Sequence, residues 1–356
     1  MRYGILILIL LILFGCDTDL ISTKSSGTKH DKIALGRYLF YENRLSINHT
    51  KSCGSCHAPE LMFADGYRRS VSPYGENLIH NSPSLINCVE LQFLGWSNPN
   101  IKTLSQQIER PLYNEHPREM GLHKHIDEVM AYLMKDSLYN HLFKRCYPRD
   151  TFPYSANHII ECIVAFESTI HSQKSPYDLY IKGDSSAFNE SAKRGLKLFS
   201  SATLKCIQCH TPPHFTMATL AKNPDSVYFN IGLYNVGGNH QYPKNDPGIM
   251  EYTGRESDNG KFRVPSLRNV LLTAPYMHDG SVNTIEEVID LYAAGGRNVT
   301  WGSLQGDGRK NKNKSILVQG FTLTQEEKKN LIDFLAALTD SSILRNEALQ
   351  NPFRIR

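Results

Sequence analysis

The sequence predicts a mainly α-helical protein made of two related domains in tandem, with long loops. Apolar residues recur at helical spacing in six segments: 33–41, 126–133, 158–170, 191–199, 285–292 and 324–338. The pattern Cys-x-x-Cys-His occurs twice, at 53–57 and 206–210. A Gly-x-x-Leu-Phe segment precedes each copy, at 36–40 and 195–199. Strand-like runs are few and short, so β-structure is expected to contribute little.

The two Cys-x-x-Cys-His motifs predict covalent attachment of two c-type haems. Two thiols one helical turn apart can add to the vinyl groups of haem, and the adjacent histidine can bind the iron. The attachment residues are then Cys53, Cys56, His57, Cys206, Cys209 and His210. A four-cysteine zinc site also uses paired cysteines, but it needs no histidine after each pair. A thioredoxin-like motif would open a helix in a βαβ unit, and no such pattern is present.

The paired motifs therefore predict two cytochrome c-like haem domains. In each Gly-x-x-Leu-Phe segment, Gly and Phe share one helix face, and the glycine would let a flat group approach closely. Thr324 and Glu327 match a capping box at the start of the last helix. The expected divisions are an N-terminal haem domain, a C-terminal haem domain and a C-terminal tail, at 31–185, 186–340 and 341–356. A polar linker and two polar loops are expected at 173–186, 211–261 and 295–314.

The N-terminus reads as an export signal. Arg2 precedes an apolar run at 5–14, which is shorter than the roughly 20 residues that span a bilayer. Residues 1–15 are then a signal peptide, and 13–16 resemble a bacterial lipobox, which makes Cys16 a candidate lipidation site. An ordinary signal peptide followed by a chance cysteine is the alternative. Residues 16–30 would form a polar tether, so we expect a periplasmic protein held to a membrane only through a lipid.

Composition limits the remaining possibilities. The chain has 356 residues, of which 40% are hydrophobic and 21% charged, so disorder is a poor interpretation. A net charge of +4 gives no reason to expect nucleic-acid binding. Three cysteines remain besides Cys16 and the haem motifs. Cys162 is expected to be a buried free thiol, and a disulfide between Cys88 and Cys146 is possible.

Further motifs resemble those of the bacterial di-haem cytochrome c peroxidase family, which includes the methylamine-utilisation enzyme MauG. They lie at 35–40, 44–46, 63–66, 81–85, 117–121, 264–269 and 273–280. The resemblance extends from about residue 35 to residue 340. It implies an enzyme that reduces hydrogen peroxide at the N-terminal haem. Electrons would come from a small cytochrome c or cupredoxin through the C-terminal haem. Members of this family usually form dimers.

The resemblance also implies roles for individual residues. Glu119 falls on the family's distal glutamate, Gln107 on its companion glutamine, and Trp96 on the tryptophan between the haems. Glu119 would move a proton between the peroxide oxygens, first as base and then as acid, in a pocket that raises its pKa. Arg268 and His278 would anchor haem propionates.

A calcium ion joins the two domains in this family. Its ligands map to the Asn81 side chain and to the carbonyls of Thr273 and Pro275, a set that suits calcium's oxygen coordination. A histidine that blocks the first haem in some peroxidases would fall near Ser72 here. His80 is the nearby histidine, and we expect it to be hydrogen-bonded in its loop. The first haem is therefore expected to be open.

One departure from typical peroxidases concerns the second haem. Where they have a methionine ligand this chain has Tyr292, and MauG also has a tyrosine there. A phenolate favours ferric and higher states of iron, whereas a thioether favours ferrous iron. Tyr292 could instead pack in its helix. The functional alternatives are a MauG-like enzyme that uses peroxide to modify residues of a partner protein, and a non-enzymatic electron-transfer or sensor protein.

Overall fold

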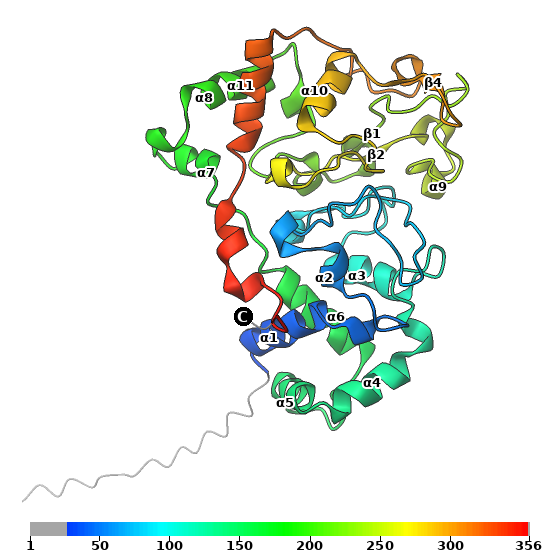
Figure 1. Ribbon diagram of the computed structural model, residues 1–356, viewed down its shortest axis with the longest axis vertical. Helices are drawn as coiled ribbons and strands as arrows, with labels where there is room; N and C mark the ends of the chain where they lie inside the picture. The colour runs from blue at the N-terminus through cyan, green and yellow to red at the C-terminus, as the bar shows by residue number, and fades with distance from the viewer. Residues whose placement is uncertain (1–26, 355–356) are drawn as a thin grey trace, which may run out of the picture.

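The computed structural model describes residues 27–354, and the fold is mainly α-helical as expected (Figure 1). The predicted signal peptide, Cys16 and most of the predicted tether lie outside the described residues. The first helix begins at Lys29, inside the end of the predicted tether. Between residues 27 and 354, no helix combines the length and the apolar character needed to cross a bilayer.

The helices fall into two groups that follow chain order (Figure 1). The first half contains α1 (Lys29–Phe40), α2 (Cys53–Cys56), α3 (Leu104–Tyr113), α4 (Ile126–Lys135), α5 (Ser137–Cys146) and α6 (Ala156–Glu167). The second half contains α7 (Pro176–Ile181), α8 (Glu190–Phe199), α9 (Met250–Thr253), α10 (Ile285–Ala293) and α11 (Gln325–Ala336). Two short antiparallel pairs complete it: β1 (Tyr228–Phe229) with β2 (Phe262–Arg263), and β3 (Asn298–Val299) with β4 (Gly306–Asp307).

The six segments with helical spacing correspond to α1, α4, α6, α8, α10 and α11. The capping box is confirmed, because the Thr324 hydroxyl accepts from the Glu327 backbone N–H and the Glu327 carboxylate accepts from that of Thr324. Helices α3 and α5 were not expected. The predicted linker also differs from expectation, since it contains α7, whose Tyr177 and Asp178 are buried.

The glycines of the two Gly-x-x-Leu-Phe segments permit close helix crossings. A Cβ atom on Gly36 of α1 would lie 1.8 Å from the Cys162 carbonyl oxygen of α6. A Cβ atom on Gly195 of α8 would lie 1.9 Å from the Asn330 carbonyl oxygen of α11. The expectation of a flat group at these glycines is therefore wrong. The backbone of a crossing helix fills the space, in the same way in both halves.

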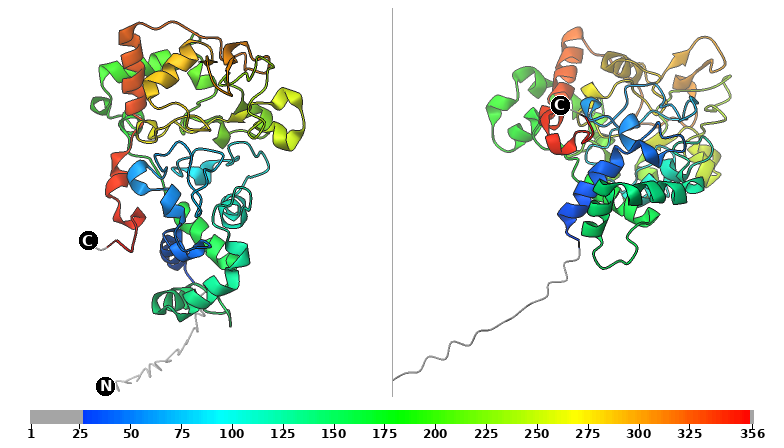
Figure 2. Two further views of the ribbon diagram at one scale, coloured as in Figure 1. Left: turned by 45° about the vertical axis from the view of Figure 1, so that its right-hand side comes forward. Right: turned by 60° about the horizontal axis from the view of Figure 1, so that its bottom comes forward.

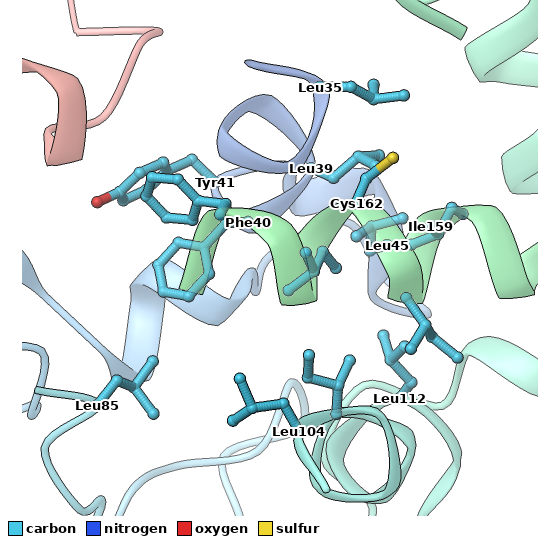
Figure 3. Packing of buried hydrophobic residues seen from close by; sticks show 14 of the residues in the cluster. Leu35, Leu39, Phe40, Tyr41, Leu45, Leu85, Leu104, Leu112, Ile159 and Cys162 are labelled. Atoms are coloured by element: carbon cyan, nitrogen blue, oxygen red, sulfur yellow. The ribbon is translucent and has the colours of Figure 1, made fainter. Parts of the chain in front are cut away.

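Each half has its own apolar core. The first core packs α1 and α6 against α3, as Leu35, Phe40, Leu104 and Ile159 show (Figure 3). The second core is made by residues between 177 and 338. The disulfide between Cys88 and Cys146, which the sequence left open, is not formed, because both thiols are free. Cys146 instead forms a side-chain hydrogen bond with Cys162, which is buried and free as expected.

The C-terminal segment packs against the first half. After α11 it returns to the first half (Figure 2), where Ile343 and Leu349 join the first core. The Tyr41 hydroxyl donates to the Leu349 carbonyl at 2.6 Å, and Arg37 Nε donates to the Gln350 carbonyl at 2.8 Å. The last residues of the chain therefore help to close the first half.

The glycine contacts make the first prediction. Gly195→Ala should lower the free energy of unfolding by about 2 kcal/mol, because the forced separation of α8 and α11 outweighs alanine's better helix propensity. Urea denaturation followed by circular dichroism measures this change. Lys197→Ala on the exposed side of α8 is the control and should change stability by less than about 0.5 kcal/mol. Equal midpoints for both variants would contradict the prediction.

Candidate functional site

The first motif is presented by a short capped helix. Ser52 and Ser55 form a capping box at the start of α2, which carries Cys53 and Cys56, and His57 ends it. The His57 Nδ1 atom lies 2.9 Å from the Phe63 carbonyl oxygen. A carbonyl can only accept, so Nδ1 carries the proton and Nε2 is left with a lone pair for a metal.

The second motif repeats this arrangement. His210 Nδ1 lies 3.0 Å from the Phe215 carbonyl oxygen and 3.1 Å from that of Pro265. Burial lowers the pKa of His210 to about 4, against the opposing effect of these carbonyls, so the imidazole is neutral near pH 7. Both histidines therefore present Nε2 as a potential ligand.

The helix crossings and the two histidines are connected through aromatic packing. Phe40 of α1 packs against Phe63, with ring centroids 6.2 Å apart, and Phe199 of α8 packs against Phe215 at 6.0 Å. Phe63 and Phe215 have φ angles of 60° and 53°, which are unfavourable for bulky residues. This backbone conformation accompanies the carbonyl contact to each histidine.

A cavity between the two halves surrounds the second motif. Cys206, Cys209 and His210 line it together with Tyr292 of α10, and Asn81 and Trp96 contribute from the first half. Most of the remaining lining is apolar and includes Phe199, Leu204, Phe262, Val264, Leu331 and Leu335. Such a lining suits a flat apolar ring. Burial raises the pKa of Tyr292, and its proximity to the two cysteines raises it further.

A buried cation in this cavity was not expected. Arg263 is 5% exposed, its Nε atom has no partner, and its guanidinium lies 5.5 Å from the Trp96 ring centroid. A buried charge is costly unless paired, so Arg263 is suited to an anionic group such as a haem propionate. Arg268, expected in that role, lines the same cavity and binds Asp178 at 2.7 Å and the Pro213 carbonyl at 2.6 Å. Its propionate contact stays a prediction.

The two residues predicted to form the peroxide site, Gln107 and Glu119, lie on α3 and on the segment after it. The side-chain amide oxygen of Gln107 is buried and has no hydrogen-bond partner. Burial raises the pKa of Glu119, and the Asn114 amide, 3.5 Å away, opposes this only in part. Burial is also the main cause that raises the pKa of the Cys56 thiol to about 11, and the Glu119 carboxylate contributes. Glu119 is therefore close to the first motif and in a poorly solvated position.

Trp96 is held at the contact between the halves. Its indole N–H donates to the Asn81 carbonyl at 2.9 Å, and its own carbonyl accepts from the Arg263 N–H at 2.9 Å. The Asn81 N–H donates to the His278 carbonyl at 2.8 Å, and the Asn81 amide donates to the Tyr67 carbonyl at 2.8 Å. Thr273 and Pro275 line the same cavity as Asn81.

Three polar side chains meet near this contact. Asp246 lies 3.0 Å from His80 Nε2 and 3.3 Å from His278 Nε2. Burial works against the charged form, but hydrogen bonds from His278 and His80 hold the pKa of Asp246 well below its usual range. His80 is thus hydrogen-bonded, but to Asp246 in the second half rather than within its own loop as expected. The His278 ring stacks on the Phe262 ring with centroids 3.5 Å apart, and the propionate contact expected for His278 stays a prediction.

The donor sets fit two c-type haems, each with two thiols and a histidine whose Nε2 is available. The first would be held by Cys53, Cys56 and His57. The second would be held by Cys206, Cys209 and His210, with Tyr292 lining the same cavity. Fold and site together define a helical c-type cytochrome with two haem attachment sites.

Comparison with known proteins identifies the family. The family model for di-haem cytochrome c peroxidase matches residues 30–186. The cytochrome-c peroxidase IdrP1 of Pseudomonas sp. (strain SCT) is 30% identical, over 91% of this chain and 85% of its own length. The methylamine utilization protein MauG of Methylorubrum extorquens is 29% identical, over 88% and 80%. A MauG-like protein associated with microbial copper homeostasis, known from a crystal structure, is 39% identical to this chain, with a TM-score of 0.87. The match covers 91% of this chain and 93% of that protein.

These similarities cover most of both halves. The chain belongs to the di-haem cytochrome c peroxidase family, whose members are oxidoreductases with two c-type haems. The motifs were readable in the sequence because they are local. Arg263 could have been noticed only as an arginine beside an apolar run, since its missing partner is a property of the fold.

Proposed function

We propose that this protein reduces hydrogen peroxide with electrons from a small cytochrome c or cupredoxin. The observation that carries the proposal is the poorly solvated carboxyl of Glu119, which acts electrostatically on Cys56 of the first motif, and the unpartnered side-chain oxygen of Gln107 supports it. When bound there, haem supplies the redox-active iron for the reaction. His80, which is bonded to Asp246, is consistent with an open peroxide site.

Glu119 acts on protons in this proposal. Cleavage of the peroxide bond needs a proton moved from one oxygen to the other, and a carboxylate near its own pKa can accept and return it. The raised pKa of Glu119 brings it closer to neutral pH, where both steps are efficient. Gln107 orients the substrate through its free amide group, since a buried acceptor without a partner gains most from a hydrogen-bond donor.

Trp96 is the proposed relay between the two haems. It lines the cavity around the second motif, and its backbone carbonyl accepts from the Arg263 N–H of the second half. The neighbouring Arg263 guanidinium disfavours a positive charge on the indole. A propionate bound to Arg263 would remove that effect.

Glu119→Gln should slow the reaction with peroxide by roughly 100-fold or more, because the proton acceptor is lost. Stopped-flow mixing of the di-haem protein with peroxide measures the rate. Glu109→Gln, an exposed carboxyl on α3, is the control. In the wild type the rate should fall as pH drops through the raised pKa of Glu119, above the ordinary 4.5, because the base becomes protonated. An unchanged rate in Glu119→Gln would favour the non-enzymatic alternative.

A second candidate is a MauG-like function, in which peroxide oxidises residues of a partner protein. Tyr292 favours it, because this side chain shares the cavity wall with His210. The 39% identity to a MauG-like protein also favours it. A phenolate ligand stabilises the oxidised states of iron and disfavours electron uptake.

Steady-state oxidation of a reduced small cytochrome c separates the two candidates. Sustained turnover supports the peroxidase. A long-lived oxidised spectrum without turnover supports the MauG-like function. Tyr292→Met should raise the reduction potential of one haem, because a thioether favours ferrous iron. Tyr276→Phe, in the same cavity, is the control and should leave both potentials unchanged. Equal potentials in wild type and Tyr292→Met would exclude Tyr292 as a ligand.

Calcium is proposed at Asn81, Thr273 and Pro275. The Asn81 side-chain nitrogen donates to the Tyr67 carbonyl, which leaves the side-chain oxygen of Asn81 as a metal ligand. Calcium binds amide oxygens of this kind. Metal analysis of the purified protein should find one calcium ion per chain, and Asn81→Ala should lose it. A metal-free wild type with two haems would contradict the site.

We also propose that the protein is exported to the periplasm and carries a lipid at Cys16. Mass spectrometry of the mature N-terminus checks both points.

A further inference from the structure

A strongly basic segment of the second half is not used by the proposed chemistry. It runs from residue 297 to residue 316, through the β3–β4 hairpin and the chain that follows, and we name it the basic loop. It contains five Lys or Arg side chains and one acidic side chain, Asp307. Arg309 binds Asp307 at 2.7 Å, so this carboxylate is neutralised by its neighbour. The segment lies at an edge of the second half, where Figure 1 labels β4.

One side of the basic loop is fixed to the protein. The Arg297 N–H donates to the Gly232 carbonyl at 2.9 Å, and the Asn311 amide donates to the Tyr234 carbonyl at 3.0 Å. These bonds hold the segment in one conformation. Its remaining side chains therefore form a preorganised surface, which reduces the ordering cost of binding a partner.

The exposed side chains of the basic loop, which we call its outer side, include two large apolar residues and two lysines. Trp301, between β3 and β4, is 82% exposed, and Ile316 is 77% exposed. Lys310 and Lys312 are exposed, and neither takes part in the ion pairs of residues 27–354. Tryptophan is enriched among residues that dominate binding energy at protein interfaces. Apolar anchors with unpaired cations beside them suit a partner that is apolar at its centre and acidic around it.

The basic loop also forms part of the wall of the cavity around the second motif. Ser315 and Leu317, on either side of Ile316, line the cavity together with His210 and Tyr292. A protein bound over Ile316 is thus separated from the cavity by one chain segment. Electron transfer between proteins requires such a short separation.

We infer that the outer side of the basic loop, at Trp301, Lys310, Lys312 and Ile316, docks a small redox protein with an acidic contact surface. The inference deepens the proposed function, because it assumes that a soluble protein exchanges electrons with the second site. Long-range attraction raises the encounter rate of oppositely charged proteins and weakens with salt. Small and transient interfaces are typical of redox partners.

The experiment measures binding and turnover separately on the di-haem holoprotein. Two probes are used, an acidic small c-type cytochrome and a basic one. Calorimetry with the oxidised cytochromes gives affinity at low and at moderate salt. Oxidation of the reduced cytochromes by peroxide gives kcat/KM. The variants are Lys310→Glu combined with Lys312→Glu, and Trp301→Ala. The control combines Lys135→Glu on α4 with Lys197→Glu on α8, which changes the net charge equally on other surfaces.

The wild type should bind the acidic cytochrome more tightly than the basic one, and salt should weaken the binding. Both variants should lose roughly tenfold or more in affinity and in kcat/KM for the acidic cytochrome, while the control keeps them. Peroxide reactivity without a donor should be unchanged in all proteins. No binding of the acidic cytochrome, stronger binding of the basic one, or wild-type affinity in the lysine variant would overturn the docking surface. Binding at this surface without turnover would preserve the docking surface and reject the peroxidase.

Discussion

The two histidine contacts depend on how closely two pairs of helices cross. Gly36 and Gly195 let α1 and α8 touch the backbones of α6 and α11, and any larger side chain would push the helices apart. Four residues after each glycine, a phenylalanine packs against a second phenylalanine whose carbonyl faces the motif histidine. The orientation of each imidazole is therefore set by helix packing on the far side of its own domain core. Both halves therefore orient the motif histidine through the same arrangement of a glycine, two phenylalanines and a backbone carbonyl.

The contact between the halves is organised by polar groups as well as by apolar packing. Trp96 and Asn81 exchange backbone and side-chain hydrogen bonds with residues on both sides, and Asp246 gathers two histidines beside them. Such groups are costly to bury unless their partners are correctly placed. The relative placement of the two halves is consequently specific.

Local patterns in the sequence were reliable guides, and long-range partnerships were not. The attachment motifs, the capping box and six helices follow from residues close together in the chain. Helix α3 was missed because Pro111 interrupts its pattern. Helix α5 was overlooked although its buried residues, Tyr139, Leu142, Phe143 and Cys146, recur at helical spacing. The ion pair of Arg268 with Asp178 was missed because the segment treated as a linker folds into α7. Arg263 and the basic loop acquire meaning only from what surrounds them. The roles of Glu119, Gln107 and Tyr292 came from family resemblance rather than from any local pattern.

The return of the C-terminal segment to α1 has a consequence for the order of assembly. A ribosome delivers the chain from its N-terminus, so the first core must wait for Ile343 and Leu349. Until then Tyr41 lacks the Leu349 carbonyl, which its hydroxyl binds in the finished fold. Tyr41 also lies against Gly54 of the first attachment motif, where a Cβ atom would be 2.4 Å from its ring. The surroundings of the first motif are thus completed only when the C-terminal segment is in place.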